Sequence, residues 1–405
     1  MACLLWEDSF YESGVAIADR IATLCEKVEP DKIMEIADKC KNQMHLRHTP
    51  LYLAILAIKN GGGTQEQINA VISRADGLGE LLALYWKVNG KDKPIANRLK
   101  KALAKAFNKF DTYQLSKYAN RGDIKLRDVM FLVHPKPIET MVDVYKKLAS
   151  NTLEAPLTWE VELSAGKDKA TTFLNLMKEN KLGGLAFIRN LRNMIQAGID
   201  KKTISTYSQK VNVDKILPYQ FIAAANANPS LEDVIEPLML KALNGMPKLP
   251  GKTVLLIDIS GSMFGTKISQ KSELDRFDAA AGLAILGREL CEESVVYSFS
   301  NNPVLVPNRR GFALKDAIKN SQSHGGTSIG ASIREALAKE KNADRLIVFS
   351  DEQSNDKVDD PKIKSYMLNV ASYQNGVGYN GSWTNITGFS ENTFRYIQDL
   401  EISAV

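Results

Sequence analysis

The chain has 405 residues and a formal net charge of +5, and 44% of its residues are hydrophobic and 24% charged, which excludes a wholly disordered protein and predicts two to three domains. Its four cysteines are widely spaced and include no Cys-x-x-Cys pair, which excludes a disulfide framework or a zinc ribbon and favours a reducing, cytoplasmic location. The amino terminus has no basic stretch before its short apolar run, and the longest apolar run, 51–58, has eight residues, so we expect neither a signal peptide nor a membrane span.

Up to about residue 245, apolar residues recur at helical spacing and turn signals interrupt them often. Helices are predicted at about 33–40, 50–58, 64–75, 77–87, 94–110, 111–119, 124–132, 137–149, 167–179, 184–196, 200–208, 215–225 and 230–244. Alternating β-branched runs are few, so this part is predicted to be an all-α array. Because it has no crisp repeat, a degenerate solenoid of HEAT-like helix pairs is the best description.

The pattern changes at a linker rich in proline and glycine, 245–251. Beyond it, predicted strands (253–257, 294–300, 302–307, 344–350 and 365–372) alternate with predicted helices (273–290, 313–320, 329–339 and 390–400). Apolar strands separated by helices predict a parallel, doubly wound, Rossmann-like sheet. We therefore expect a multidomain protein, with a helical domain over 1–247 and an α/β domain over 248–405.

Oxygen-bearing side chains follow the strands of this predicted sheet. Asp258, Ser260 and Ser262 come directly after its first strand, Thr327 lies in a glycine-rich loop, and Asp351 ends the strand 344–350. In a doubly wound sheet these positions meet at the edge formed by the carboxyl ends of the strands. Two carboxylates and three hydroxyls suit a hard divalent cation, Mg²⁺ or Mn²⁺. The Asp-x-Ser-Gly-Ser run alone also suits a turn capped by serine, but three correctly placed segments together favour the metal site.

This three-segment pattern resembles the metal-ion-dependent adhesion site of von Willebrand factor A domains. The resemblance implies that Ser260, Ser262 and Thr327 coordinate the ion directly, while Asp258 and Asp351 act mainly through waters. One coordination position would stay open for an acidic group of a partner. The sequence has no Asp-x-Asp phosphatase start and no phosphate-binding glycine loop at the first turn, so we expect no catalytic residues and no enzyme.

Positive charge gathers in the window 87–127, where 12 basic residues face three acidic ones, a net charge of +9. Within it, Arg98, Lys101, Lys105 and Lys109 fall on one side of a predicted amphipathic helix whose neighbouring arc is apolar. Such a ridge suits RNA phosphates without reading bases. A solvated helix face is the alternative interpretation.

Several motifs of the helical part and of the linker resemble the Ro autoantigen, or TROVE, family. They are the Lys-Tyr-Ala-Asn-Arg run at 117–121, the stretch 126–137 with its His-Pro-Lys-Pro end, the Phe-Ile-Arg-Asn-Leu run at 187–191, and the segments 216–219 and 238–263 that lead into the metal motif. The resemblance spans nearly the whole chain. The family usually carries a further amino-terminal stretch, and this sequence starts close to its end.

Membership of that family implies a ring of HEAT-like helix pairs closed by a von Willebrand factor A domain. It implies Y-like RNA on a basic outer surface, single-stranded ends of misfolded RNA in a central hole, and contacts to RNA from Lys117, Arg121 and His134. An alternative interpretation of His134 is a helix-terminal residue that satisfies the last carbonyls, because Pro135 ends that helix.

Three function classes are therefore compared. The first is a non-enzymatic RNA-binding scaffold of a ribonucleoprotein in RNA quality control, with RNA as partner, a ribonuclease or another protein as a further partner, and no membrane. The second is a protein-adhesion module whose metal grips an acidic residue of a protein partner. A metal-dependent hydrolase is a distant third, because the sequence positions no general base. The basic window favours the first.

Overall fold

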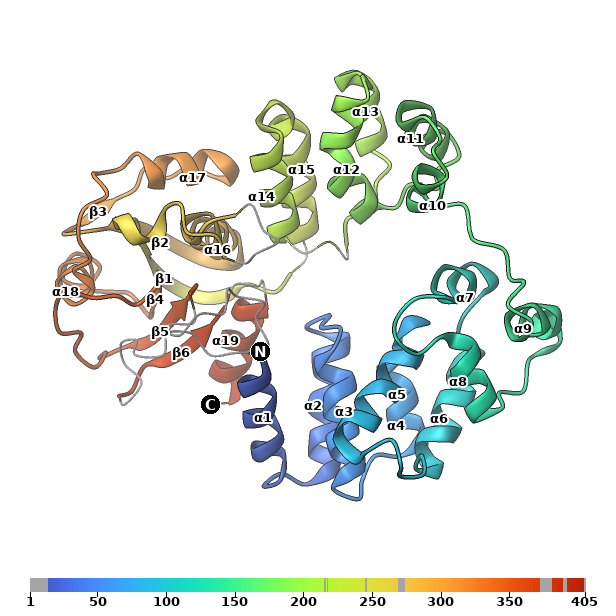
Figure 1. Ribbon diagram of the computed structural model, residues 1–405. Helices are drawn as coiled ribbons and strands as arrows, with labels where there is room; N and C mark the ends of the chain where they lie inside the picture. Colours follow the sequence, from blue (N-terminus) through green and yellow to red (C-terminus); the bar gives the residue numbers. More distant parts are fainter. Residues whose placement is uncertain are drawn as a thin grey trace. The chain divides into compact units, whose positions relative to one another are not determined.

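The computed structural model describes residues 14–214, 216, 218–244, 246–268, 274–371, 381–388 and 392–403 (Figure 1). The chain forms two compact units: a helical unit, Ala18–Lys167, and a mixed unit that comprises Asp168–Val405 with the first 17 residues. The change from helices alone to alternating strands and helices falls between Leu243 and Leu249, inside the mixed unit and next to the predicted boundary at 247/248. The division into domains at that boundary stays a prediction.

The helical unit contains short helices in series. In chain order these are α1 (Gly14–Cys25, which begins before the unit), α2 (Pro30–Asn42), α3 (Thr49–Lys59), α4 (Gln65–Val71), α5 (Asp76–Asn89), α6 (Asn97–Phe107), α7 (Thr112–Tyr118), α8 (Leu126–Val133), the 3₁₀ turn Glu139–Met141, α9 (Val142–Ala149) and α10 (Trp159–Ser164). Reciprocal capping boxes start two of them, Thr64 with Gln67 at α4 and Asp111 with Gln114 at α7. The apolar faces of the helices pack into one continuous core, in which α3 is the most fully buried helix.

The mixed unit starts with five more helices: α11 (Lys169–Lys178), α12 (Gly184–Gln196), α13 (Lys201–Ser208), α14 (Pro218–Ala227) and, after the 3₁₀ turn Pro229–Leu231, α15 (Glu232–Leu243). The sheet follows, with β1 (Leu249–Asp258), β2 (Cys291–Phe299), β3 (Pro303–Leu305), β4 (Arg345–Ser350), β5 (Lys364–Asn369) and β6 (Thr384–Thr387). Between the strands lie the 3₁₀ turn Gly261–Met263, α16 (Arg276–Leu290), α17 (Gly311–Lys319) and α18 (Ile329–Lys339), and α19 (Asn392–Ser403) follows β6.

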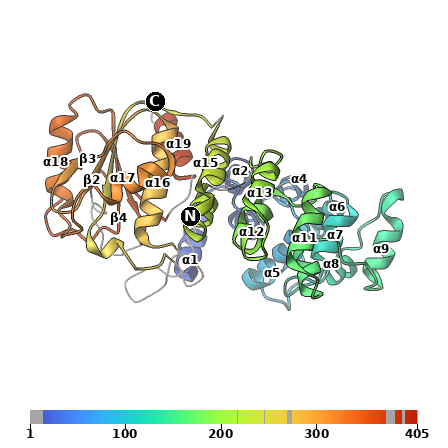
Figure 2. The same ribbon diagram turned by 90° about the horizontal axis from the view of Figure 1, so that it is seen from above.

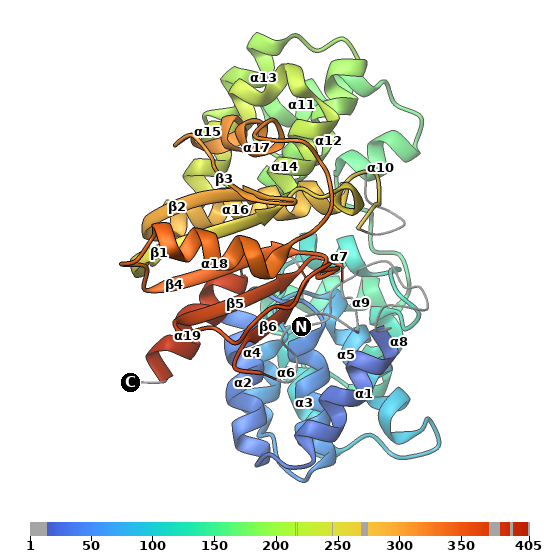
Figure 3. The same ribbon diagram turned by 90° about the vertical axis from the view of Figure 1, so that its left-hand side faces the viewer.

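The sheet has the strand order β3-β2-β1-β4-β5-β6, which Figure 3 shows face-on behind α18. Four of its five pairings are parallel, but β2 and β3 are antiparallel. The prediction of a wholly parallel sheet was therefore wrong at this edge. The reason is the connection: three residues, 300–302, can close a hairpin but cannot make the long crossover that a parallel neighbour needs.

Helices cover both faces of the sheet, and the alternate residues of β1 show this because they point to opposite faces. Val254 and Leu256 belong to a core cluster with Ile333 of α18. Leu255, on the other face, lies against Gly287 of α16, where an added Cβ would meet it at 3.0 Å. Figure 2 shows α16 and α18 on opposite sides of the strands. This two-sided burial explains why the strands read as continuous apolar runs.

The helical part followed by an α/β part is confirmed, and most predicted helices coincide with α2–α9 and α11–α15. Helices α1 and α10 and strand β6 were not predicted. In α10, all of whose residues the structure describes, none is fully buried, so the apolar periodicity that reveals a helix is missing.

Two expectations about the chain's chemistry concern its cysteines and its hydropathy. Within the ranges that the structure covers, none of the helices has both the length and the apolar character required to cross a membrane. Cys25, Cys40 and Cys291 are buried free thiols, as a sequence without a disulfide framework predicts. Cys3 lies outside the described residues.

Candidate metal centre and nucleic-acid interface

The strand order places the predicted metal residues at one point of the sheet. The chain leaves β1 toward β2 on one side, whereas β4 lies on the other side of β1, so the strand order reverses between β1 and β4. Asp258 is the last residue of β1, and Asp351 directly follows β4. Ligands of doubly wound sheets bind in the crevice at this reversal.

Short hydrogen bonds fix the side chains at the end of β1. Asp258 is fully buried, and its two carboxylate oxygens accept from the Ser260 backbone N–H at 2.8 Å and from the Ser350 hydroxyl at 2.6 Å. The hydroxyl oxygens of Ser260 and Ser262 lie 3.3 Å apart. That separation suits two neighbouring ligands of one Mg²⁺, whose oxygen ligands lie about 2.1 Å from the ion. Asp258 already uses both oxygens locally, so an ion would meet it mainly through water.

The carboxylates of Asp258 and Asp351 are both buried at this point, so a nearby cation would stabilise their charged forms. Burial and then the nearby charge of Asp351 raise the pKa of Asp258 to about 7. The Arg276 guanidinium, itself largely buried at the start of α16, donates to one Asp351 oxygen at 2.8 Å and supplies one positive charge. Sequence reasoning missed Arg276, which lies 75 residues from its partner. The donor set, two carboxylates with three hydroxyls, fits a divalent cation.

Backbone contacts join the three loops of the site. The Gly261 N–H donates to the Gly325 carbonyl at 3.3 Å, and the Asn355 N–H donates to the Thr327 carbonyl at 2.8 Å. The loop that carries Thr327, which is 6% exposed, is therefore bonded through Gly325 to the turn after β1 and through Thr327 to the loop after Asp351. The structure thus brings the loops of all five predicted residues together.

Helix α18 packs closely against the loop 351–357, which follows β4. Asp356 accepts from the backbone N–H groups of Gly330 at 3.0 Å and Ala331 at 2.7 Å, which caps the first turn of α18. A Cβ on Gly330 would meet the Lys357 carbonyl oxygen at 2.0 Å. Only glycine permits α18 and the 351–357 loop to lie this close.

Gly330→Ala is therefore expected to lower the free energy of unfolding by about 1–3 kcal/mol, since the loop or the helix must shift to make room. Urea denaturation followed by circular dichroism measures the change. Gly183→Ala is the matched control, because its added Cβ meets nothing within 4 Å. Equal stability of the two variants would show that the approach at Gly330 carries no constraint.

Lys117 and Arg121 lie together on the helical unit, around a tyrosine. The Lys117 ammonium lies 5.8 Å and the Arg121 guanidinium 5.7 Å from the centroid of the Tyr118 ring. Arg74, from the connection between α4 and α5, lies 5.2 Å from the same centroid and donates to the Tyr118 hydroxyl at 3.0 Å. We call Arg74, Lys117, Tyr118 and Arg121 the Tyr118 cluster. Sequence reasoning missed Arg74, because it lies 44 residues before the tyrosine.

His134 directly follows α8, at the carboxyl end of that helix. It caps the helix in the left-handed conformation (φ 49°), its backbone N–H donates to the Met130 carbonyl at 2.9 Å, and its side chain is exposed. Arg121 lies before α8, in the connection from α7, so the whole of α8 stands between the two residues in the chain. The helix-terminal role expected as an alternative is thus present in the backbone, while the imidazole faces solvent.

The four cations of the predicted ridge are exposed, but two of them hold neighbouring helices. Arg98 donates to the carbonyls of Gly61 and Gly62 at 2.8 and 2.6 Å, and Lys109 donates to those of Asn69 and Ile72 at 2.6 and 2.8 Å. Burial, with a smaller contribution from the charge of Lys41, lowers the pKa of Lys109. Helix ends attract such cations.

The other two members of the ridge differ. Lys101 is exposed, and Lys105 lies 3.8 Å from Glu66, a distance at which an exposed ion pair contributes little. These two lysines are therefore the better candidates for phosphate contacts.

Comparisons with known proteins found a matching family model, a relative in sequence and a solved structure of similar fold. Residues 150–244 match the model of the TROVE domain family. A stretch of 217 residues, half of the chain, is 26% identical to telomerase protein component 1 of Mus musculus, and the match covers 8% of that much longer protein. The fold is similar to that of the crystal structure of the RO (RSR) protein of Deinococcus radiodurans, with a TM-score of 0.69 and 15% identity over 95% of this chain and 94% of that one.

Proposed function

Because residues 150–244 match the TROVE domain family and the fold is similar to that of a Ro protein, we propose that the chain is an RNA-binding, non-enzymatic scaffold of a ribonucleoprotein. The Tyr118 cluster is the observation that carries the proposal. It gathers three cations around one aromatic ring on the most basic stretch of the chain. Cations and aromatic rings together bind the phosphates and bases of RNA.

The finer proposal follows the family resemblance. Y-like RNA binds the basic outer ridge, and the single-stranded ends of misfolded RNA enter a central hole, where Lys117, Arg121 and His134 hold them. RNA quality control in the cytoplasm is the process that such binding serves. A ribonuclease or another protein would act on the RNA that this scaffold presents.

Filter binding with purified RNA tests the proposal directly. The purified chain is expected to bind single-stranded RNA with an affinity that falls steeply with salt, because each neutralised phosphate releases counterions. Copurifying nucleic acid, visible as a raised 260/280 absorbance ratio, would support the same conclusion. A purified chain that binds no RNA at low salt would contradict it.

A second candidate function is favoured by the buried oxygen set after β1 and β4. We propose that Ser260, Ser262 and Thr327 bind Mg²⁺ or Mn²⁺ directly and that Asp258 and Asp351 contribute through water. The bound cation would supply a Lewis-acidic position open to an acidic group. In a protein-adhesion module that group is an aspartate or glutamate of a partner protein, and binding of an acidic protein that requires Mg²⁺ but not RNA would favour this function.

The outer ridge gives a separate prediction. Lys101→Glu with Lys105→Glu is expected to weaken binding of structured RNA and to lower the salt slope by roughly 0.7–0.9 for each phosphate that is no longer neutralised. Arg98 and Lys109 stay intact, since they hydrogen-bond neighbouring helix ends. The measurement is the RNA affinity between 50 and 300 mM salt.

The matched control reverses two exposed lysines outside the ridge, Lys91→Glu with Lys93→Glu. It makes the same change in net charge on the same unit. If both double variants lose the same affinity, net charge explains the effect and the ridge is only a solvated face.

A further inference from the structure

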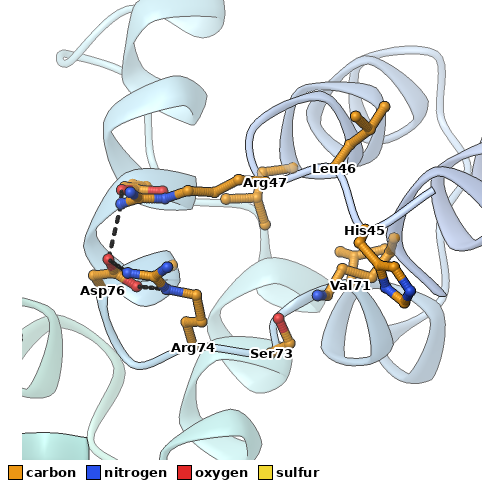
Figure 4. Close-up of a pocket in the computed structure, with 11 residues that line it drawn as sticks. His45, Leu46, Arg47, Val71, Ser73, Arg74 and Asp76 are labelled. Carbon is orange, nitrogen blue, oxygen red and sulfur yellow. Dashed lines mark hydrogen bonds and ion pairs between the residues drawn. The ribbon is translucent and has the colours of Figure 1, made fainter. Parts of the chain in front are cut away.

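A polar pocket opens on the helical unit, beside the Tyr118 cluster (Figure 4). It encloses about 450 Å³, including its open mouth, between the end of α2, the α2–α3 turn and the connection into α5. Its charged lining residues are Lys41, Arg47, Arg74, Asp76 and Glu80. Two of these cations, Arg47 and Arg74, lie beside the two carboxylates.

The two carboxylates hold the arginines in place. Arg74 makes a bidentate pair with Asp76, with Nε–Oδ1 and Nη2–Oδ2 distances of 3.0 and 2.8 Å. Arg47 donates to the same carboxylate at 2.8 Å and also to Glu80. Figure 4 shows the two arginines reaching Asp76 from different segments of the chain. A guanidinium fixed in this way loses little freedom when it binds a ligand.

Donors remain on both guanidinium groups for such a ligand. A guanidinium carries five N–H groups. Among the hydrogen bonds of the described residues, Arg47 uses only Nη2, and Arg74 uses Nε and Nη2. Burial opposes the charge of Arg74, but the hydrogen bond and charge of Asp76, with smaller contributions from Tyr118 and Glu80, raise its pKa, so it stays positive.

Arg74 links the pocket to the Tyr118 cluster. Its guanidinium lies over the same ring as Lys117 and Arg121, so three positive charges lie within 6 Å of one ring centroid. Asp76 compensates the charge of Arg74, and an anion bound near Lys117 and Arg121 would further reduce the repulsion among the three cations. The pocket and the cluster together therefore favour a ligand that carries several phosphates along a chain.

We infer that this pocket takes a phosphate group of the single-stranded RNA that Lys117 and Arg121 bind. Arg47 and Arg74 supply the N–H groups, and Asp76 and Glu80 orient them. The inference rests on the proposed RNA-binding function and extends its site by two arginines and a pocket. The phosphate belongs either to the RNA backbone or to a 5′ end.

Ser73 offers a test that leaves all of these interactions in place. It is exposed and lines the pocket. Ser73→Glu places a carboxylate there and is expected to weaken binding of a single-stranded oligouridine about tenfold, with a salt slope lower by roughly 0.7. Ser73→Gln, of similar size and neutral, should bind within about twofold of the unmodified chain. Thr140→Glu, exposed and outside the pocket, controls for net charge.

The RNA is used with either a 5′ hydroxyl or a 5′ phosphate. A loss with both RNAs assigns the pocket to a backbone phosphate, whereas a loss confined to the 5′-phosphorylated RNA assigns it to the terminal group. Inorganic phosphate should compete with the RNA more weakly on Ser73→Glu than on Ser73→Gln.

Two further outcomes would overturn the inference, and they differ in what else they affect. If Ser73→Glu binds both RNAs as tightly as Ser73→Gln while Lys117→Ala with Arg121→Ala loses affinity, only the pocket assignment is wrong. If the unmodified chain binds neither RNA, the proposed function fails together with the inference.

Discussion

The double variant Asp258→Ala, Ser260→Ala is expected to bind no stoichiometric Mg²⁺ or Mn²⁺. Mg²⁺ requires near-octahedral oxygen geometry and tolerates few missing ligands. The substitutions remove the Ser260 hydroxyl, which we propose coordinates the ion directly, and the buried carboxylate of Asp258, which accepts hydrogen bonds from Ser260 and Ser350. Isothermal titration calorimetry of the metal-free protein measures the change. The expected loss is at least about 100-fold in affinity, because carboxylates that only hydrogen-bond the direct ligands of a metal already contribute about 10–100-fold.

Asp344→Asn is the matched control for this experiment. Asp344 lies just before β4, at the opposite end of the strand from Asp351, and accepts from the Lys252 backbone N–H at 2.7 Å. It should bind metal as the unmodified chain does. Circular dichroism must show that the double variant keeps its secondary structure, and unchanged metal affinity in a folded double variant would defeat the metal assignment.

The sequence predicts the strand ends and loops that carry these residues, because the signals for them are local. The run that ends β1 at Asp258, the glycines before Thr327 and the apolar strand before Asp351 each reveal a strand end or a tight loop. Parallel topology then places the three loops at one edge. The role of Arg276 could not be predicted in this way, because its contact with Asp351 depends on how α16 packs against the sheet.

The basic residues show more clearly which contacts cannot be predicted from the sequence. Helical periodicity correctly places Arg98 on an exposed side of α6, but Lys109, which is also exposed, lies beyond the end of that helix at Phe107. The periodicity gives no sign that both residues donate to carbonyls of earlier segments. Tertiary packing determines which partner a charged side chain meets, and in these cases the partner lies 36–40 residues away in the sequence. The same reason hides Arg74, which the fold brings onto Tyr118. Sequence therefore predicts where positive charge lies, and the structure shows which of these cations donate hydrogen bonds to other segments of the fold.

The triple variant Lys117→Ala, Arg121→Ala, His134→Ala is expected to weaken binding of RNA with a free single-stranded 3′ tail by about 2–4 kcal/mol, at roughly 0.7–1.3 kcal/mol for each of the three side chains removed. This corresponds to roughly 30- to 900-fold in the dissociation constant. Competition binding against a labelled tailed RNA measures it. Blunt structured RNA, which we propose binds the outer ridge, should be much less affected.

Single variants separate the contributions within this surface. Because α8 separates His134 from Arg121, His134→Ala should add its effect independently, whereas Lys117→Ala and Arg121→Ala share the Tyr118 ring and should not be additive. Arg121→Lys keeps the charge but loses the planar fork, so it should recover only part of the affinity. Equal losses for tailed and blunt RNA would show that these residues act as a general basic surface, and no loss for either would remove all three from the RNA-binding site.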